Sequence, residues 1–186
     1  MLLPLLVLLV MVSSAAKVNA TSAQVLSESQ IKAGFLFNFT RFIEWPDHAF
    51  ATPTSAFSVC IIGATPLVDL LTQAAMGKVV NGRSLTIRGV KSTDDLHTCQ
   101  ILFLSMTEER RAAHILESVK GMSVLTVSEI PGFAAAGGMI DFVVEENKVK
   151  LEMNVDATSH TGLKVSAKLI AVSHLVSGHS SIGGHE

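Results

Sequence analysis

Two cysteines are the residues whose chemistry is easiest to interpret in this chain. Cys60 and Cys99 each lie in a short apolar run typical of a buried strand, behind an N-terminal segment that resembles an export signal. Exported proteins meet an oxidising compartment, so we expect one disulfide. The alternative is two buried free thiols. A metal site is disfavoured, because the pair has neither C-x-x-C spacing nor a histidine at the spacing of a zinc site.

Residues that would bind a nucleotide or catalyse a reaction form no recognisable motif. The turn at residues 63–66 (Gly-Ala-Thr-Pro) has one glycine where dinucleotide binders have three, and Pro66 lacks the N–H that would bind phosphate. No P-loop, G-x-S-x-G or H-E-x-x-H motif occurs. The histidines His174, His179 and His185 are unevenly spaced and would need the tail to fold back. We therefore expect no catalytic residue, cofactor or metal.

Residues 1–20 predict a signal peptide cleaved near Ala20. Residues 2–12 are apolar, and Val-Asn-Ala at 18–20 is a plausible cleavage site, although no Lys or Arg precedes the apolar run. A longer signal or a lipid-facing anchor is the alternative. The net charge is −2, and it becomes −3 when Lys17 leaves with the signal. This charge disfavours a nucleic-acid partner, which would require a basic face.

The remaining residues, 21–186, predict a single α/β domain, with a loose tail at 179–186. Ser27 and Gln30 match a capping box, before a helix that ends near Trp45-Pro46. Apolar strands are then expected at 57–63, 84–90, 99–105 and 123–127, with helices after Pro66 and Thr107. Strands that alternate with helices indicate parallel β-α-β units and a Rossmann-like, three-layer arrangement.

The last third of the domain predicts a β-hairpin followed by short helices. Residues 140–144 and 149–153 alternate between apolar and polar around a turn at 146–148. Asp156 is expected to cap a short helix that Gly162 ends, and Ser166 is expected to open a second one.

Four stretches together resemble the YfiR family of periplasmic regulators: IKAGFLFNFTRFIEWP, FSVCIIG, CQILFLS, and the block from VLTVSE through GGMIDFVVEENKVKLEMN to GLKVSAKLIAVS. The resemblance implies a periplasmic, often dimeric repressor that binds the periplasmic sensor domain of an inner-membrane diguanylate cyclase and lowers cyclic di-GMP synthesis. In some family members, an outer-membrane lipoprotein sequesters the repressor and so relieves the repression of the cyclase. One family disulfide corresponds to Cys60 and Cys99, whereas a second pair present in some members is missing from this chain.

A repressor of this kind needs an exposed apolar surface that the core does not use. The candidates for partner binding are Ile140, Phe142, Leu151 and Leu163. Phe35, Phe39 and Phe42 on the first helix are the candidates for a dimer face. Each of these residues has core packing as its alternative role, because alternation buries one face of every strand.

A second hypothesis is a small-ligand sensor. Its pocket would lie at the carboxyl ends of the strands, near Gly63, Ser105 and Ser128.

Overall fold

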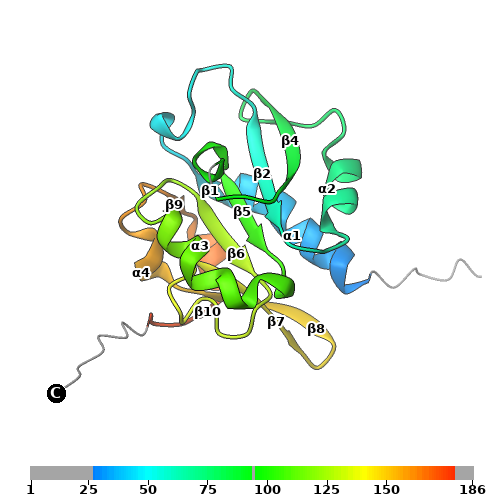
Figure 1. Ribbon diagram of the computed structural model, residues 1–186, viewed down its shortest axis with the longest axis vertical. Coiled ribbons are helices and arrows are strands. Elements are labelled where there is room, and N and C mark those ends of the chain that lie inside the picture. The colour runs from blue at the N-terminus through cyan, green and yellow to red at the C-terminus, as the bar shows by residue number, and fades with distance from the viewer. Residues whose placement is uncertain (1–26, 94, 179–186) are drawn as a thin grey trace, which may run out of the picture.

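An eight-stranded mixed sheet forms the centre of the fold (Figure 1). The computed structural model describes residues 27–93 and 95–178, so the expected signal peptide and tail lie outside the described residues. The strand order is β10-β8-β7-β6-β5-β2-β4-β3. The strands are β2 (Phe57–Ile62), β3 (Val79–Val80), β4 (Arg83–Val90), β5 (Ile101–Leu104), β6 (Leu125–Ser128), β7 (Ile140–Glu145), β8 (Lys148–Met153) and β10 (His174–Leu175).

Strands β4, β2, β5, β6 and β7 lie side by side and run parallel. Parallel units were predicted for the first four of these strands, whereas β7 was predicted only as half of a hairpin. Numbered along the chain, these five strands have the order 2-1-3-4-5, because β4 and β5 lie on opposite sides of β2. A dinucleotide-binding Rossmann sheet has the order 3-2-1-4-5-6 instead. The structure therefore confirms the α/β class, but it does not confirm the Rossmann-like description specifically.

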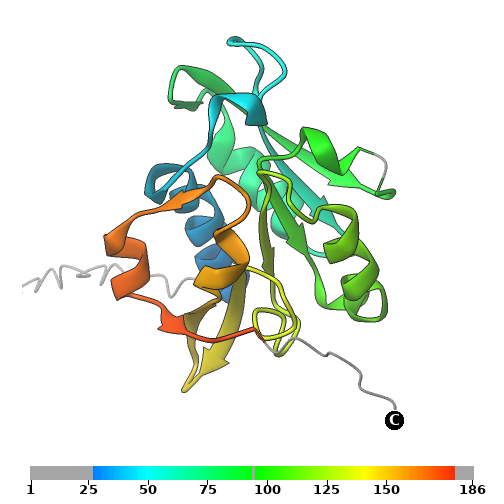
Figure 2. The same cartoon turned by 90° about the vertical axis from the view of Figure 1, so that its left-hand side faces the viewer.

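Helices cover both faces of the sheet, which Figure 2 shows nearly edge-on. On one face, α1 (Glu28–Phe42) and α2 (Leu67–Ala75) enclose the larger apolar core with the segment that carries α4 (Val155–Thr158) and α5 (Ala167–Ala171). On the other face, α3 (Ala112–Ser118) covers a second core around the cysteines. Three short 3-10 helices join these elements: η1 (Asp47–Ala49), η2 (Leu96–Thr98) and η3 (Met106–Arg111).

Helix caps show where local sequence rules held. Ser27 and Gln30 form the expected capping box at α1, and Ser166 caps α5 by accepting from Leu169 N–H. Two other assignments were wrong. Asn154 caps α4 instead of Asp156, and Thr107 lies within η3 and caps no helix.

Two tight turns set the register of the hairpins. Asn81 and Gly82 have φ values of 49° and 80° between β3 and β4, and Glu146 and Asn147 have values of 48° and 61° between β7 and β8. Positive φ at both central residues is the type I′ geometry that matches strand twist. Both turns were predicted from the sequence.

A second, two-stranded sheet was not predicted. β1 (Ile43–Glu44) pairs antiparallel with β9 (Lys164–Val165), which ties the end of α1 to the C-terminal third of the chain. Each strand is only two residues long, so neither produces a periodic pattern in the sequence.

Candidate functional site

The two cysteines form the expected disulfide. Cys60 on β2 and Cys99 before β5 have Cα atoms 5.8 Å apart and are fully buried. Arg88 on β4 lies beside them, with Nη2 3.4 Å from the sulfur of Cys60 and a hydrogen bond to Thr98 Oγ1. The bridge therefore links β2 to the segment that leads into β5, and the Arg88 guanidinium lies next to both sulfurs.

The usual ligand position in a sheet of this type is the crevice where the strand order reverses, between the carboxyl ends of β2 and β5. Here the chain fills that crevice itself. Gly63 has a φ of 93°, and a Cβ atom at this position would lie 2.2 Å from Ser105 Oγ. Ala64 N–H, which would face a phosphate, donates to Thr107 Oγ1 at 3.1 Å. This side-chain contact explains why Thr107 does not cap a helix.

The three residues expected around a sensor pocket do not converge on one. Ser105 and Ser128 are fully buried. Ser128 Oγ donates to Leu104 O at 2.9 Å and accepts from Ile130 N–H at 3.0 Å, so both serines are used within the fold. Gly63 alone lines a cavity, of about 390 Å³, beside the ends of β2 and β4.

One serine and one histidine lie within reach of each other, but they lack the arrangement of a nucleophile and its base. Ser123 Oγ lies 3.2 Å from His48 Nε2 and donates its proton to Thr161 O at 2.6 Å. His48 must then donate to the serine and cannot accept its proton. Within residues 27–93 and 95–178 no group of three or more His, Cys, Asp or Glu side chains could hold a metal ion.

The residues proposed for partner binding lie in the core. Ile140, Phe142, Leu151 and Leu163 are between 0% and 8% exposed. The first three lie on the hairpin face that packs against α1, which also explains why they alternate in sequence. The expectation that they form an exposed apolar surface is therefore wrong.

The proposed dimer face is also largely used within the chain. Phe39 is fully buried, and its ring stacks on Phe142 with centroids 6.2 Å apart. Phe35 packs against Phe142 as well, at 5.9 Å. Only Phe35 and Phe42 remain partly exposed, so a dimer at this face stays a prediction for these two residues.

A charged cluster at the carboxyl ends of β6 and β7 was missed entirely. Lys32 on α1 is 5% exposed and forms ion pairs with Glu28 and with Glu129, the latter at 2.7 Å. Burial opposes the charge on this ammonium, but the hydrogen bonds to Glu129 and Glu28 outweigh it and raise the pKa of Lys32. With Glu152 and several apolar side chains, these three residues line a cavity of about 650 Å³.

Asp141 on β7 is the least expected member of this region. It is fully buried; Oδ2 accepts from Phe133 N–H at 3.1 Å, whereas Oδ1 has no hydrogen-bond partner. Burial raises the pKa of Asp141 to about 6, and the negative charge of Glu152 across the hairpin adds to this effect. The alternation of apolar and polar residues in this strand suggested that Asp141 faces solvent. The structure differs because the loop after β6 covers this face, which the sequence does not show.

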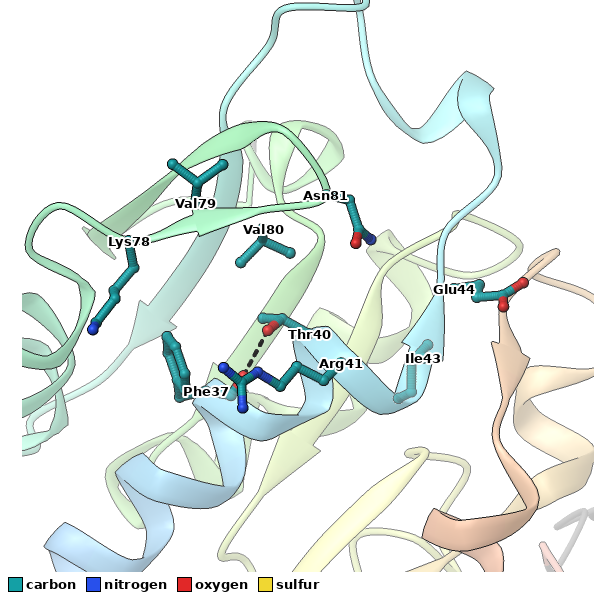
Figure 3. Close-up of a pocket in the computed structure, with 9 residues that line it drawn as sticks. All are labelled: Phe37, Thr40, Arg41, Ile43, Glu44, Lys78, Val79, Val80 and Asn81. Carbon is teal, nitrogen blue, oxygen red and sulfur yellow. Dashed lines mark hydrogen bonds between the residues drawn. The ribbon is translucent and has the colours of Figure 1, made fainter.

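A surface groove runs between α1 and the outermost strand β3 (Figure 3). Its volume is about 540 Å³, and its lining residues are Phe37, Thr40, Arg41, Ile43, Glu44, Lys78, Val79, Val80 and Asn81. Arg41 lies over the Phe37 ring at 5.6 Å, and Lys78, the residue before β3, lies at the same end of the groove as Phe37. Next to it, Met76 and Val79 are 71% and 66% exposed. Together the groove and these two exposed apolar side chains form a candidate protein-binding surface.

A comparison with protein families covers most of the elements described above. The sequence model of the YfiR/HmsC-like family matches residues 29–174, which extend from α1 to the start of β10. The chain belongs to the YfiR/HmsC-like family. The matched range includes most of α1, the disulfide strands and the hairpin, so the resemblance seen in the four sequence stretches is confirmed.

This YfiR/HmsC-like chain has no helix, among its described residues, that is long and apolar enough to cross a membrane. Of the residues selected from its sequence, Cys60 and Cys99 form a disulfide. The four candidates for partner binding are buried. The groove residues went unnoticed because Arg41, Lys78 and Val79 come from separate elements. The one available signal was the Asn81-Gly82 turn, which implied a strand before it as well as after it.

Proposed function

We propose that this chain is an exported, non-enzymatic regulator that binds the periplasmic domain of an inner-membrane diguanylate cyclase and lowers cyclic di-GMP synthesis. Membership of the YfiR/HmsC-like family over residues 29–174 is the observation that carries the proposal. The export-type N-terminus supports a periplasmic location, and a buried disulfide is consistent with that oxidising compartment. The homodimer and the outer-membrane lipoprotein partner stay predictions from the family resemblance.

The test combines binding with signalling. The protein is purified from the periplasm and titrated, with and without reductant, against the periplasmic domains of the diguanylate cyclases of the same organism. We expect one of them to bind, and deletion of the gene to raise cyclic di-GMP only while that cyclase is present. If no cyclase domain binds in either redox state and deletion leaves cyclic di-GMP unchanged, the proposal is wrong.

A further inference from the structure

The outer edge of β3 carries backbone groups that no strand in the described part of the chain uses. β3 is the last strand of the sheet. Val80 pairs with Arg83 next to the turn, and Lys78 O accepts from Leu85 N–H at 3.3 Å. In an antiparallel pair, hydrogen-bonded positions alternate with positions whose groups point outwards. The N–H and C=O of Val79, which lies between these two positions, therefore point away from β4 towards the open edge.

This edge borders the groove in Figure 3, where α1 lies below β3. Val80 points from the strand towards Thr40 on the helix and is only 7% exposed, whereas the Val79 side chain points away from the helix. An extended segment lying along β3 would thus hydrogen-bond to Val79 and contact Phe37 on the helix. Strand addition to an exposed sheet edge is a common mode of peptide recognition.

The positive charge around the groove favours a segment with acidic side chains. Residues 70–93 include four cations, Lys78, Arg83, Arg88 and Lys91, and no Asp or Glu, although the whole chain has a net charge of −2. Arg83 and Arg88 are occupied within the fold by hydrogen bonds. Lys78 and Arg41 are exposed and line the groove from its two sides. The one carboxylate of the lining, Glu44, lies at the opposite end of the groove from Lys78 (Figure 3), so the lining keeps an excess of positive charge. A second copy offering the same edge would bring these cations together, so charge favours an acidic partner over self-pairing.

We propose that the groove between α1 and β3 binds an extended acidic segment of a partner protein, which adds to β3 as a further strand. This inference rests on the proposed function only for the identity of the partner, which would be the periplasmic domain of the cyclase. The backbone of Val79 supplies the hydrogen bonds, and Lys78 and Arg41 attract the carboxylates.

The first experiment uses a synthetic probe and does not depend on the cyclase. The mature protein is titrated with the blocked hexapeptide Glu-Val-Glu-Val-Glu-Val, and with its lysine counterpart, while backbone amide NMR signals are recorded. We expect the acidic peptide alone to shift the amides of residues 78–80, with an affinity that falls as salt is raised. If both peptides bind equally, or if neither perturbs this edge, the inference is wrong.

Two matched substitutions at one position separate the backbone from the side chain. Val79→Pro removes the outward N–H without removing a bond to β4, whereas Val79→Thr keeps the N–H and changes only an exposed side chain. We expect Val79→Pro to weaken peptide binding about tenfold or more and Val79→Thr to leave it within about twofold. If Val79→Pro and Val79→Thr both melt at the temperature of the parent protein and bind the acidic peptide equally well, strand addition is wrong.

The same variants are then tested against the cyclase domain that binds the parent protein. Loss of cyclase binding in Val79→Pro and in the charge reversal Lys78→Glu, but not in Lys91→Glu, would place the cyclase in the groove. Cyclase binding unaffected by all three would contradict the groove as the cyclase site and leave the proposed function intact. Failure of the parent to bind any cyclase would instead contradict the proposed function, while the peptide result would still decide the inference.

Discussion

Replacing Asp141 by asparagine should make the protein more stable, and only above a certain pH. The carboxyl group is fully buried on β7, and one of its oxygens has no hydrogen-bond partner. The charged form is therefore poorly solvated in the folded protein. Asparagine has nearly the same shape and can still accept the hydrogen bond from Phe133 N–H through its amide oxygen, but it never carries a charge.

The pKa values give both the size and the direction of the effect. The pKa of Asp141 rises from 3.8 to about 6 on folding. Below pH 3.8 the group is protonated in the folded and unfolded states, so it contributes no difference. Between these values the folded state retains a proton that the unfolded state loses, so stability falls as pH rises. Above pH 6 the cost levels off at about 3 kcal/mol, since one pKa unit corresponds to about 1.4 kcal/mol.

The assay is urea unfolding at pH 4 and at pH 8, followed by circular dichroism, for the parent and for Asp141→Asn. We expect nearly equal free energies of unfolding at pH 4 and a gain of about 3 kcal/mol for the variant at pH 8. Glu146→Gln removes a carboxylate from an exposed turn and serves as the control. A stability difference between parent and Asp141→Asn that is the same at both pH values would refute the argument from burial.

Three further substitutions test other parts of the structure. Cys99→Ala should lower the free energy of unfolding by about 4 kcal/mol in the chain-entropy model, because the bridge spans 39 residues. Chemical unfolding of the parent with and without reductant, and of the variant, measures this loss. A reduced parent that is as stable as the oxidised parent would contradict the prediction. Lys32→Met should cost about 3 kcal/mol by removing the cation that pairs with Glu129, and the double variant with Glu129→Gln should recover part of that loss in the same assay. Gly63→Ala should be destabilised by about 2 kcal/mol or more, through backbone strain and the contact with Ser105, whereas Gly82→Ala, with positive φ but open space, should lose only about 1 kcal/mol. Equal melting temperatures of the two glycine variants would contradict the packing argument.

Much of the fold was predictable, because local rules act within a few residues. The capping box at Ser27 and Gln30, the Asn81-Gly82 turn and the alternation in the hairpin each depend on neighbouring residues only, and each occurs as expected. Thr107 shows where such rules fail. Its hydroxyl group is close to the Gly63 turn in space, and this contact replaces the helix cap that its sequence position favoured.

The binding surface was the least predictable feature. Apolar residues on the hairpin were selected for partner binding, yet Ile140 and Phe142 are buried, since a sheet with helices on both faces leaves no apolar strand face for a partner. Val79 belongs to no periodic pattern in the sequence, because β3 is only two residues long. The exposure of Val79 follows from the position of β3 as the last strand of the sheet, which the sequence does not show.

The sequence alone determined the α/β class, the family, the turns and the cysteine pair, because periodicity, caps and motif order are properties of short stretches of chain. The tertiary structure decided which groups are exposed, charged or unpaired. Asp141 is buried because the loop after β6 covers it. Val79 lies at an open edge because, among residues 27–93 and 95–178, no strand follows β3 in the sheet. Both outcomes depend on contacts between segments far apart in the chain, and the residue types at these positions do not encode them.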